Sequence, residues 1–235
     1  MISKAIVKNT IKELLRTRQA VPIGIVSIGV VIAIVFIFKS VNYELFSTIV
    51  FLISVLFTVG IIDSDLADGK ILTVLSKPVS YTQFFLSKVL GVISVGSIII
   101  VIMMLSALII TSSAVNVNMD IKVWFVLPIA GIIAHILWTL ISATLSTFIK
   151  GYSNITAIIL FSILFGALTV IPNQTVHAII EFINNYILPA PEACLNSFKE
   201  SRVSLSGKLF HSLLYIALLS IIGPVILNHK ELGRK

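Results

Sequence analysis

The chain has 235 residues, of which 57% are hydrophobic and 11% are charged. An average soluble domain carries about 25% charged residues, so this composition excludes an ordinary water-soluble protein. The net charge is +7, but the basic residues flank apolar runs and form no separate basic domain, which argues against nucleic acid as a partner.

The first segment, residues 1–20, is predicted to be an interfacial helix. Basic residues recur at every fourth position beside an apolar stripe, so lysine stems can lie along the apolar boundary while their ammonium groups meet anionic lipid headgroups. Membrane lipid is therefore an expected partner. A basic flank that only sets topology is the alternative. The basic positions are Lys4, Lys8, Lys12 and Arg16, and the stripe is Val7, Ile11, Leu14 and Leu15.

Six apolar runs without Asp, Glu, Lys or Arg then follow along the chain. A helix needs about 20 residues to cross a hydrocarbon core, and each run is close to that length. The runs are apolar on every side, whereas membrane strands alternate, so we predict helices. The predicted fold class is an all-α membrane protein, a single transmembrane domain with spans at residues 21–38, 45–62, 89–110, 123–149, 155–171 and 209–227.

The basic residues fall unequally on the two sides of such a membrane domain. If the chain starts inside and crosses six times, 12 of the 17 Lys and Arg residues lie inside and five lie outside. Because Lys and Arg concentrate in cytoplasmic loops, both termini are predicted to be cytoplasmic. The longest outer connection, residues 172–208, is predicted to contain a short helix.

A polar stretch of 26 residues, 63–88, separates the second and third spans. Acidic residues at its start favour a helix N-terminus, and apolar residues then repeat on one face, so a short amphipathic helix is predicted over residues 64–75. Pro78 disfavours a helical residue before it, which makes Lys77 and Pro78 a turn. Ser80 then opens a capping box with Gln83, so the third helix is predicted to begin at Ser80, on the cytoplasmic side.

This stretch resembles the signature region of ABC-2 type transporter permeases. The chain differs from the usual pattern in having Asp where Glu is common, Lys70 where Thr is common, Tyr81 in place of Arg and Ser87 in place of Gly. The resemblance is carried by Gly60-Ile61-Ile62-Asp63, Asp65, Asp68-Gly69-Lys70-Ile71, Leu75-Ser76-Lys77-Pro78-Val79-Ser80 and Lys88.

The resemblance implies a membrane subunit of an ATP-driven exporter in the bacterial plasma membrane, without catalytic, cofactor or metal sites of its own. Its coupling helix would sit in a cleft of a separate ATP-binding subunit that holds ATP and Mg. Two such subunits would serve two permeases, either two copies of this chain or this chain with a related one. The sequence contains no phosphate loop that could supply the ATP site itself. The implied coupling residues are Asp63, Asp65, Asp68, Gly69, Ile71, Leu72, Leu75, Lys77 and Pro78.

The resemblance also implies that the second and fifth spans line the transport path and that the outer segment before span six forms a lid. The candidates are Phe51, Phe57, Phe161 and Phe165, with lipid-facing or core packing as the alternative for each. The absence of charge within the spans favours an amphipathic or hydrophobic cargo, such as a peptide, lipid or drug.

Two other classes of function stay open at this point. A passive channel or secondary transporter would work without an ATPase, and His135 is the one ionisable side chain deep within a span. A proton relay normally uses several ionisable groups within the membrane, so a single histidine gives little support for one. A packed, hydrogen-bonded histidine is the alternative. A structural membrane anchor without transport is the third possibility.

Overall fold

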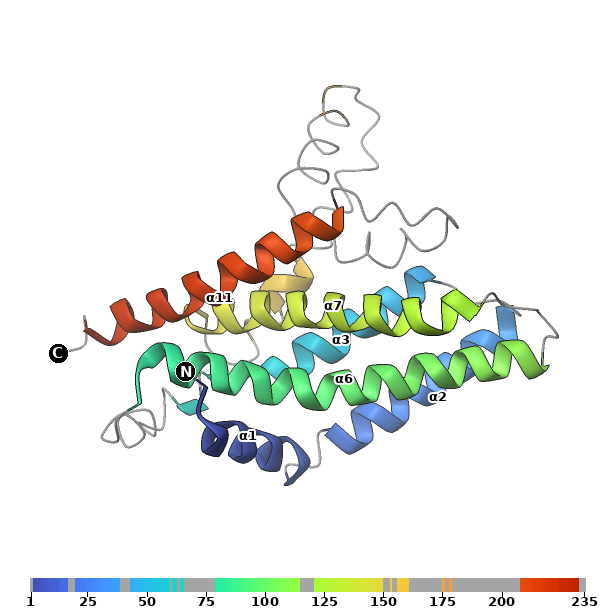
Figure 1. Ribbon diagram of the computed structural model, residues 1–235, viewed down its shortest axis with the longest axis horizontal. Helices are drawn as coiled ribbons and strands as arrows, with labels where there is room; N and C mark the ends of the chain where they lie inside the picture. Colours follow the sequence, from blue (N-terminus) through green and yellow to red (C-terminus); the bar gives the residue numbers. More distant parts are fainter. Residues whose placement is uncertain are drawn as a thin grey trace.

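The computed structural model consists of helices in the residues that it describes (Figure 1). Their order is α1 (Lys4–Arg16), α2 (Ala20–Phe38), α3 (Tyr43–Thr58), α6 (Tyr81–Ala114), α7 (Ile121–Ser146) and α11 (Lys208–Leu232). The described residues are 2–16, 20–38, 43–59, 61–62, 64–65, 79–114, 121–149, 153, 156–160, 175, 178 and 208–232.

Four of these helices are long and apolar enough to cross a membrane, namely α2, α6, α7 and α11. This confirms an all-helical, membrane-type chain, while the number of crossings and their orientation remain predictions. The predicted helix beyond residue 65, most of the fifth span and nearly all of the outer loop lie outside the described residues. Within the fifth span, residues 156–160 are helical.

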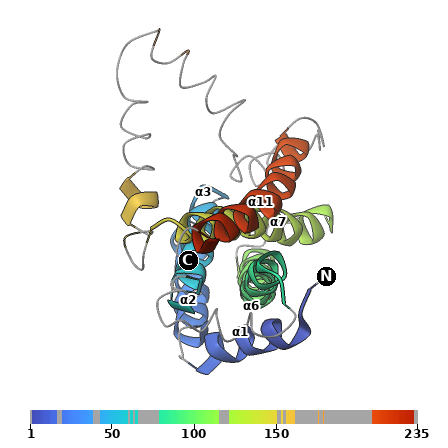
Figure 2. The ribbon, with the colours of Figure 1, turned by 90° about the vertical axis from the view of Figure 1, so that its left-hand side faces the viewer.

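Helix α6 is the centre of the bundle, and it contacts α1, α2, α3, α7 and α11. Figure 2 looks nearly along its axis and shows the other helices arranged around it. Its 34 residues give a length of about 51 Å, which exceeds the roughly 30 Å of a hydrocarbon core. The predicted span at residues 89–110 is therefore the middle part of a helix that is longer than a hydrocarbon core is thick.

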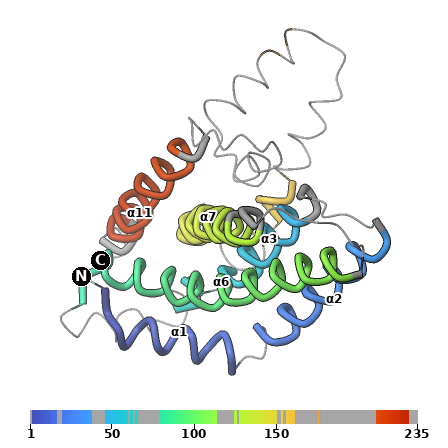
Figure 3. The backbone as a smooth tube through the Cα atoms, turned by 45° about the vertical axis from the view of Figure 1, so that its right-hand side comes forward, coloured from blue at the N-terminus to red at the C-terminus, as the bar shows by residue number. Residues whose placement is uncertain are grey.

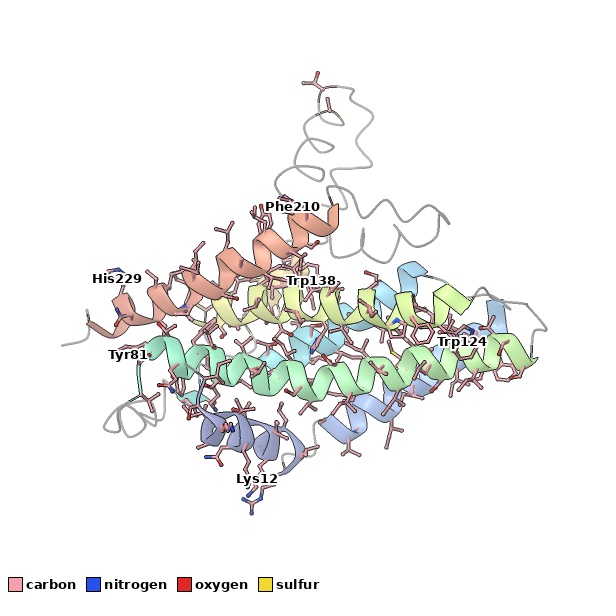
Figure 4. All side chains as sticks on the ribbon, in the orientation of Figure 1. Lys12, Tyr81, Trp124, Trp138, Phe210 and His229 are labelled. Carbon is pink, nitrogen blue, oxygen red and sulfur yellow. The ribbon has the colours of Figure 1, made fainter. Side chains whose placement is uncertain are left out.

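The predicted start of this helix is confirmed. The backbone N–H of Gln83 donates to the Ser80 hydroxyl at 3.2 Å, and α6 begins at Tyr81. In Figure 4, Tyr81 lies near His229 of α11 at one end of the bundle, while Trp124 lies toward the other end. The N-terminal end of α6 thus meets the C-terminal end of α11, and a Cβ added to Gly223 would overlap the ring of Phe85.

Replacing Ser80 by alanine is expected to destabilise the chain by about 1 kcal/mol, because the Gln83 N–H loses its cap. Thermal unfolding of the detergent-solubilised chain measures this change. Thr82→Ala is the matched control, since Thr82 is exposed in the first turn and alanine is the better helix former. Equal melting temperatures for the two variants would contradict the cap.

The second predicted span is shorter than expected. Residues 45–62 were expected to be one continuous helix, but α3 ends at Thr58 and Ile61 donates to the Thr58 carbonyl at 3.3 Å in a tightened turn. A hydrogen bond to the residue three positions back is typical of a helix terminus. Hydropathy alone did not indicate this end, because Ile61 and Ile62 are as apolar as the helix before them.

The other predicted spans differ at their ends in smaller ways. Helix α7 stops at Ser146, before the predicted end at residue 149, and residues 147–149 form a turn. Helix α11 extends past both ends of the predicted span at residues 209–227. It contacts α6 and α7 and runs obliquely to them in Figure 3.

Helix α1 covers most of the segment that is predicted to be an interfacial helix, and one of its faces packs against α6. Ile6, Thr10 and Leu14 are buried, so Leu14 of the predicted stripe belongs to the packed face, whereas Leu15 is 49% exposed. The packed face is selected by α6, because Gly91 lies so close to α1 that an added Cβ would overlap Thr10. The position of α1 in the interface stays a prediction. The backbone N–H of Ser3 donates to the Ser87 hydroxyl at 2.8 Å. In Figure 2, where α6 is seen nearly end-on, α1 runs across the view beneath it.

Candidate functional site

Lys88 forms two ion pairs near the start of α6. Its Nζ lies 2.6 Å from Oδ2 of Asp65 and 3.2 Å from Oε2 of Glu13. The same nitrogen lies 6.0 Å from the ring centroid of Phe84, within reach of a cation–π contact. We call Lys88, Asp65 and Glu13 the Lys88 cluster.

The two pairs of the Lys88 cluster differ in burial. The side chains of Lys88 and Asp65 are each 8% exposed, whereas that of Glu13 is 43% exposed. A buried carboxylate and ammonium depend on each other, because either one alone would be a buried charge without compensation. The half-exposed Glu13 contributes much less, since water screens its charge.

The cluster connects three parts of the chain that are distant in sequence. Glu13 belongs to α1, Asp65 follows α3 within the polar stretch, and Lys88 belongs to α6. Asp65 is also the last residue described before residues 66–78, over which most of the coupling helix is predicted. Ion pairs of this kind hold the elements of a fold in place.

Among the predicted coupling residues, Asp65 is the one that the structure describes. Its carboxylate bonds to Lys88 inside the chain, so its observed contact is internal. The other coupling residues lie outside the described residues, and their role stays a prediction. They are Asp63, Asp68, Gly69, Ile71, Leu72, Leu75, Lys77 and Pro78.

The ion pairs of Lys88 and Glu13 in this cluster were not predicted from the sequence. A signal for Lys88 was available, because a helix that begins at Ser80 places Lys88 one turn from both Phe84 and Val92. Phe84 and Val92 are buried, and a lysine on a buried face requires a carboxylate partner. Nothing in the sequence pairs that lysine with Glu13, 75 residues earlier.

The predicted path residues that the structure describes both belong to α3. Phe57 is fully buried in the core, so it could line a path only if α3 moved. Phe51 is half-buried and packs edge-on against Trp138 of α7, with ring centroids 4.6 Å apart. Phe161 and Phe165 lie outside the described residues. The path itself stays a prediction.

His135 lies at the meeting point of α3, α6 and α7. It is fully buried, and its Nδ1 shares a 2.7 Å hydrogen bond with the Ser54 hydroxyl. Thr139 approaches the same nitrogen at 3.4 Å, and the other side of the ring faces Gly96 of α6, where a Cβ would overlap Nε2. These contacts fit the alternative of a packed, hydrogen-bonded histidine, since they fix the ring between three helices.

No protein-family model matches this chain, and no curated protein matches its sequence. The resemblance to ABC-2 permeases therefore rests on the residues of this chain that carry it.

Proposed function

We propose that this chain is the membrane permease subunit of an ATP-driven exporter of the ABC-2 type. The Lys88 cluster carries the proposal, because it ties the start of the predicted coupling segment to the central helix. Closure of a separate ATP-binding subunit would push on the predicted coupling helix, residues 64–75. Asp65 would pass that displacement to Lys88, and so to α6 and α1 together.

The geometry of α6 suits such a transmission. Because α6 contacts α1, α2, α3, α7 and α11, a displacement of its N-terminal end reaches the whole bundle. The helix is a single continuous element of 34 residues, so a push at Lys88 acts on a rigid rod. Helices are suited to this task, since their hydrogen bonds lie within the element.

The cargo is proposed to be amphipathic or hydrophobic. The predicted spans carry no Asp, Glu, Lys or Arg, and a charge at membrane depth costs about 2.5–3.5 kcal/mol or more when no partner is present. ATP and Mg would bind to the partner subunit. The permease is proposed to work as a pair, formed by two copies of this chain or by this chain and a related permease, in the plasma membrane of a bacterium.

Co-purification tests the proposal directly. The tagged full chain, extracted from its native membrane in mild detergent, is expected to retain a protein that carries the phosphate loop and hydrolyses Mg-ATP. Asp68→Lys is expected to lower the hydrolysis of that complex at least severalfold, because Asp68 lies in the predicted coupling helix. The matched control is Asp120→Lys, an equal charge reversal before α7 that should leave hydrolysis unchanged.

The alternatives give different results in the same preparation. If liposomes that hold this chain alone move a fluorescent amphipathic amine without nucleotide, the chain is a passive channel or secondary transporter. If no ATPase is retained and Asp68→Lys changes nothing, the chain is a structural anchor.

A further inference from the structure

An open groove of about 540 Å³ runs along one edge of α1, between that helix and Leu90 of α6. Its volume is in the range of about 300–1,000 Å³ that is typical of ligand clefts. The lining is almost wholly apolar, although three of the lining residues are lysines. We call Ile2, Val7, Ile11 and Leu90 the floor, and Lys4, Lys8 and Lys12 the rim.

The three rim lysines form a row, since α1 places every fourth residue on the same face. All three are exposed, and within the part of the chain that the structure describes no carboxylate pairs with them. Figure 4 shows Lys12 extending away from the bundle. Glu13, the single acid of α1, bonds to Lys88 and lies about 160° around the helix from Ile11, at 100° per residue.

An apolar floor beside a cationic row requires a ligand with both properties. We propose that this groove binds one anionic phospholipid, with an acyl chain along Val7, Ile11 and Leu90 and the headgroup phosphate against Lys4, Lys8 and Lys12. Charge complementarity selects an anionic over a zwitterionic headgroup. The apolar floor selects a lipid over a free phosphate, because a water-soluble anion would leave Ile2 and Leu90 uncovered.

The proposed lipid site does not depend on the proposed coupling to an ATPase, because all of its lining residues belong to this chain. The groove and Glu13 lie on different edges of α1, so a lipid can bind while Glu13 stays bonded to Lys88. A bound lipid would hold α1 against α6 and stabilise the folded chain, by an amount that rises with the logarithm of the lipid concentration once the site is filled.

Lipid titration of the purified full chain in a neutral detergent, followed by native mass spectrometry, tests this site. Phosphatidylglycerol is expected to bind at least tenfold more tightly than phosphatidylcholine with the same acyl chains, and glycerol 3-phosphate is expected not to bind. Lys8→Gln should weaken the binding of phosphatidylglycerol about fivefold. Replacing Lys4, Lys8 and Lys12 together by glutamine should weaken it about a hundredfold. Leu90→Gln should weaken the binding of both lipids.

Arg16→Gln is the matched control, because it removes the same charge from the same helix at an exposed position that does not line the groove. It should change the affinity less than twofold. Equal losses of affinity for Lys8→Gln and Arg16→Gln would mean that the basic surface attracts lipid diffusely, and would overturn the site. Equal binding of the two lipids would also overturn it. Each variant is first checked for wild-type helix content by circular dichroism, which the exposed positions are expected to retain.

Discussion

Lys88→Met is expected to destabilise the folded chain by about 3–5 kcal/mol, because the substitution leaves the Asp65 carboxylate buried without its partner. A loss of this size is a large share of the about 5–15 kcal/mol by which folded proteins are typically stable. The same change disconnects the start of the polar stretch from α6. Thermal unfolding of the detergent-solubilised chain measures the destabilisation.

Two further variants show whether the buried pair is the cause. Glu13→Gln should cost less than about 1 kcal/mol, because Glu13 is 43% exposed and exposed pairs contribute little. The double variant Lys88→Met with Asp65→Leu should recover most of the lost stability, since it removes both charges and leaves apolar side chains. If the double variant melts no higher than Lys88→Met, the loss has another origin.

The Lys88 cluster also separates stability from coupling. In the rescued double variant the chain is folded, but the ion pair between the polar stretch and α6 is gone. If a retained ATPase subunit then hydrolyses ATP as it does with the wild-type chain, the cluster holds the fold together without transmitting displacement. Uncoupled hydrolysis in that variant would support the proposed transmission.

Gly96→Ala is expected to destabilise the chain by about 1–3 kcal/mol, because the added methyl group overlaps Nε2 of His135. The ring cannot move aside freely, since Ser54 holds its other nitrogen at 2.7 Å. In an open helix position the same change would stabilise by about 0.5–1 kcal/mol. The sign of the change in melting temperature therefore reports the close approach of α6 and α7.

Gly29→Ala is the matched control for this prediction. Apart from the adjoining backbone of its own helix, no atom lies within 4 Å of a Cβ built on Gly29, so the melting temperature should stay constant or rise. Adding His135→Ala to Gly96→Ala should restore stability, because the methyl group then occupies space that the imidazole leaves. Ser54 keeps its hydrogen bond to the Val50 carbonyl, so the double variant leaves no orphaned hydroxyl. A fall in melting temperature on adding His135→Ala would contradict the proposed overlap.

Much of the helix pattern could be predicted from the sequence. Runs of about 20 apolar residues must pair their backbone groups internally in lipid, so they form helices in any arrangement. The Ser80 cap was predictable for the same local reason, because its partner Gln83 is three residues away. The end of α3 at Thr58 was not, since the apolar residues beyond it offered no hydropathy signal.

The candidate site was predictable only in part. The acids of the polar stretch marked the right region, and Asp65 was among them. The sequence could not show that Asp65 bonds to Lys88 and does not face a partner subunit. Both residues lie in a polar stretch, whose composition is compatible with either contact. Burial decides this point, and burial arises when α1, α6 and the end of α3 meet.

By itself the sequence determined the membrane character of this chain, the positions of four long apolar helices and the cap that starts α6. These features depend on residues within one helix turn of each other or on the solvent around a single segment. The tertiary structure alone decided which face of α1 is buried, that Glu13 reaches Lys88, and that Gly96 lies against His135. Those contacts join residues up to 84 positions apart, such as Ser3 and Ser87, and only the packing of whole helices sets them.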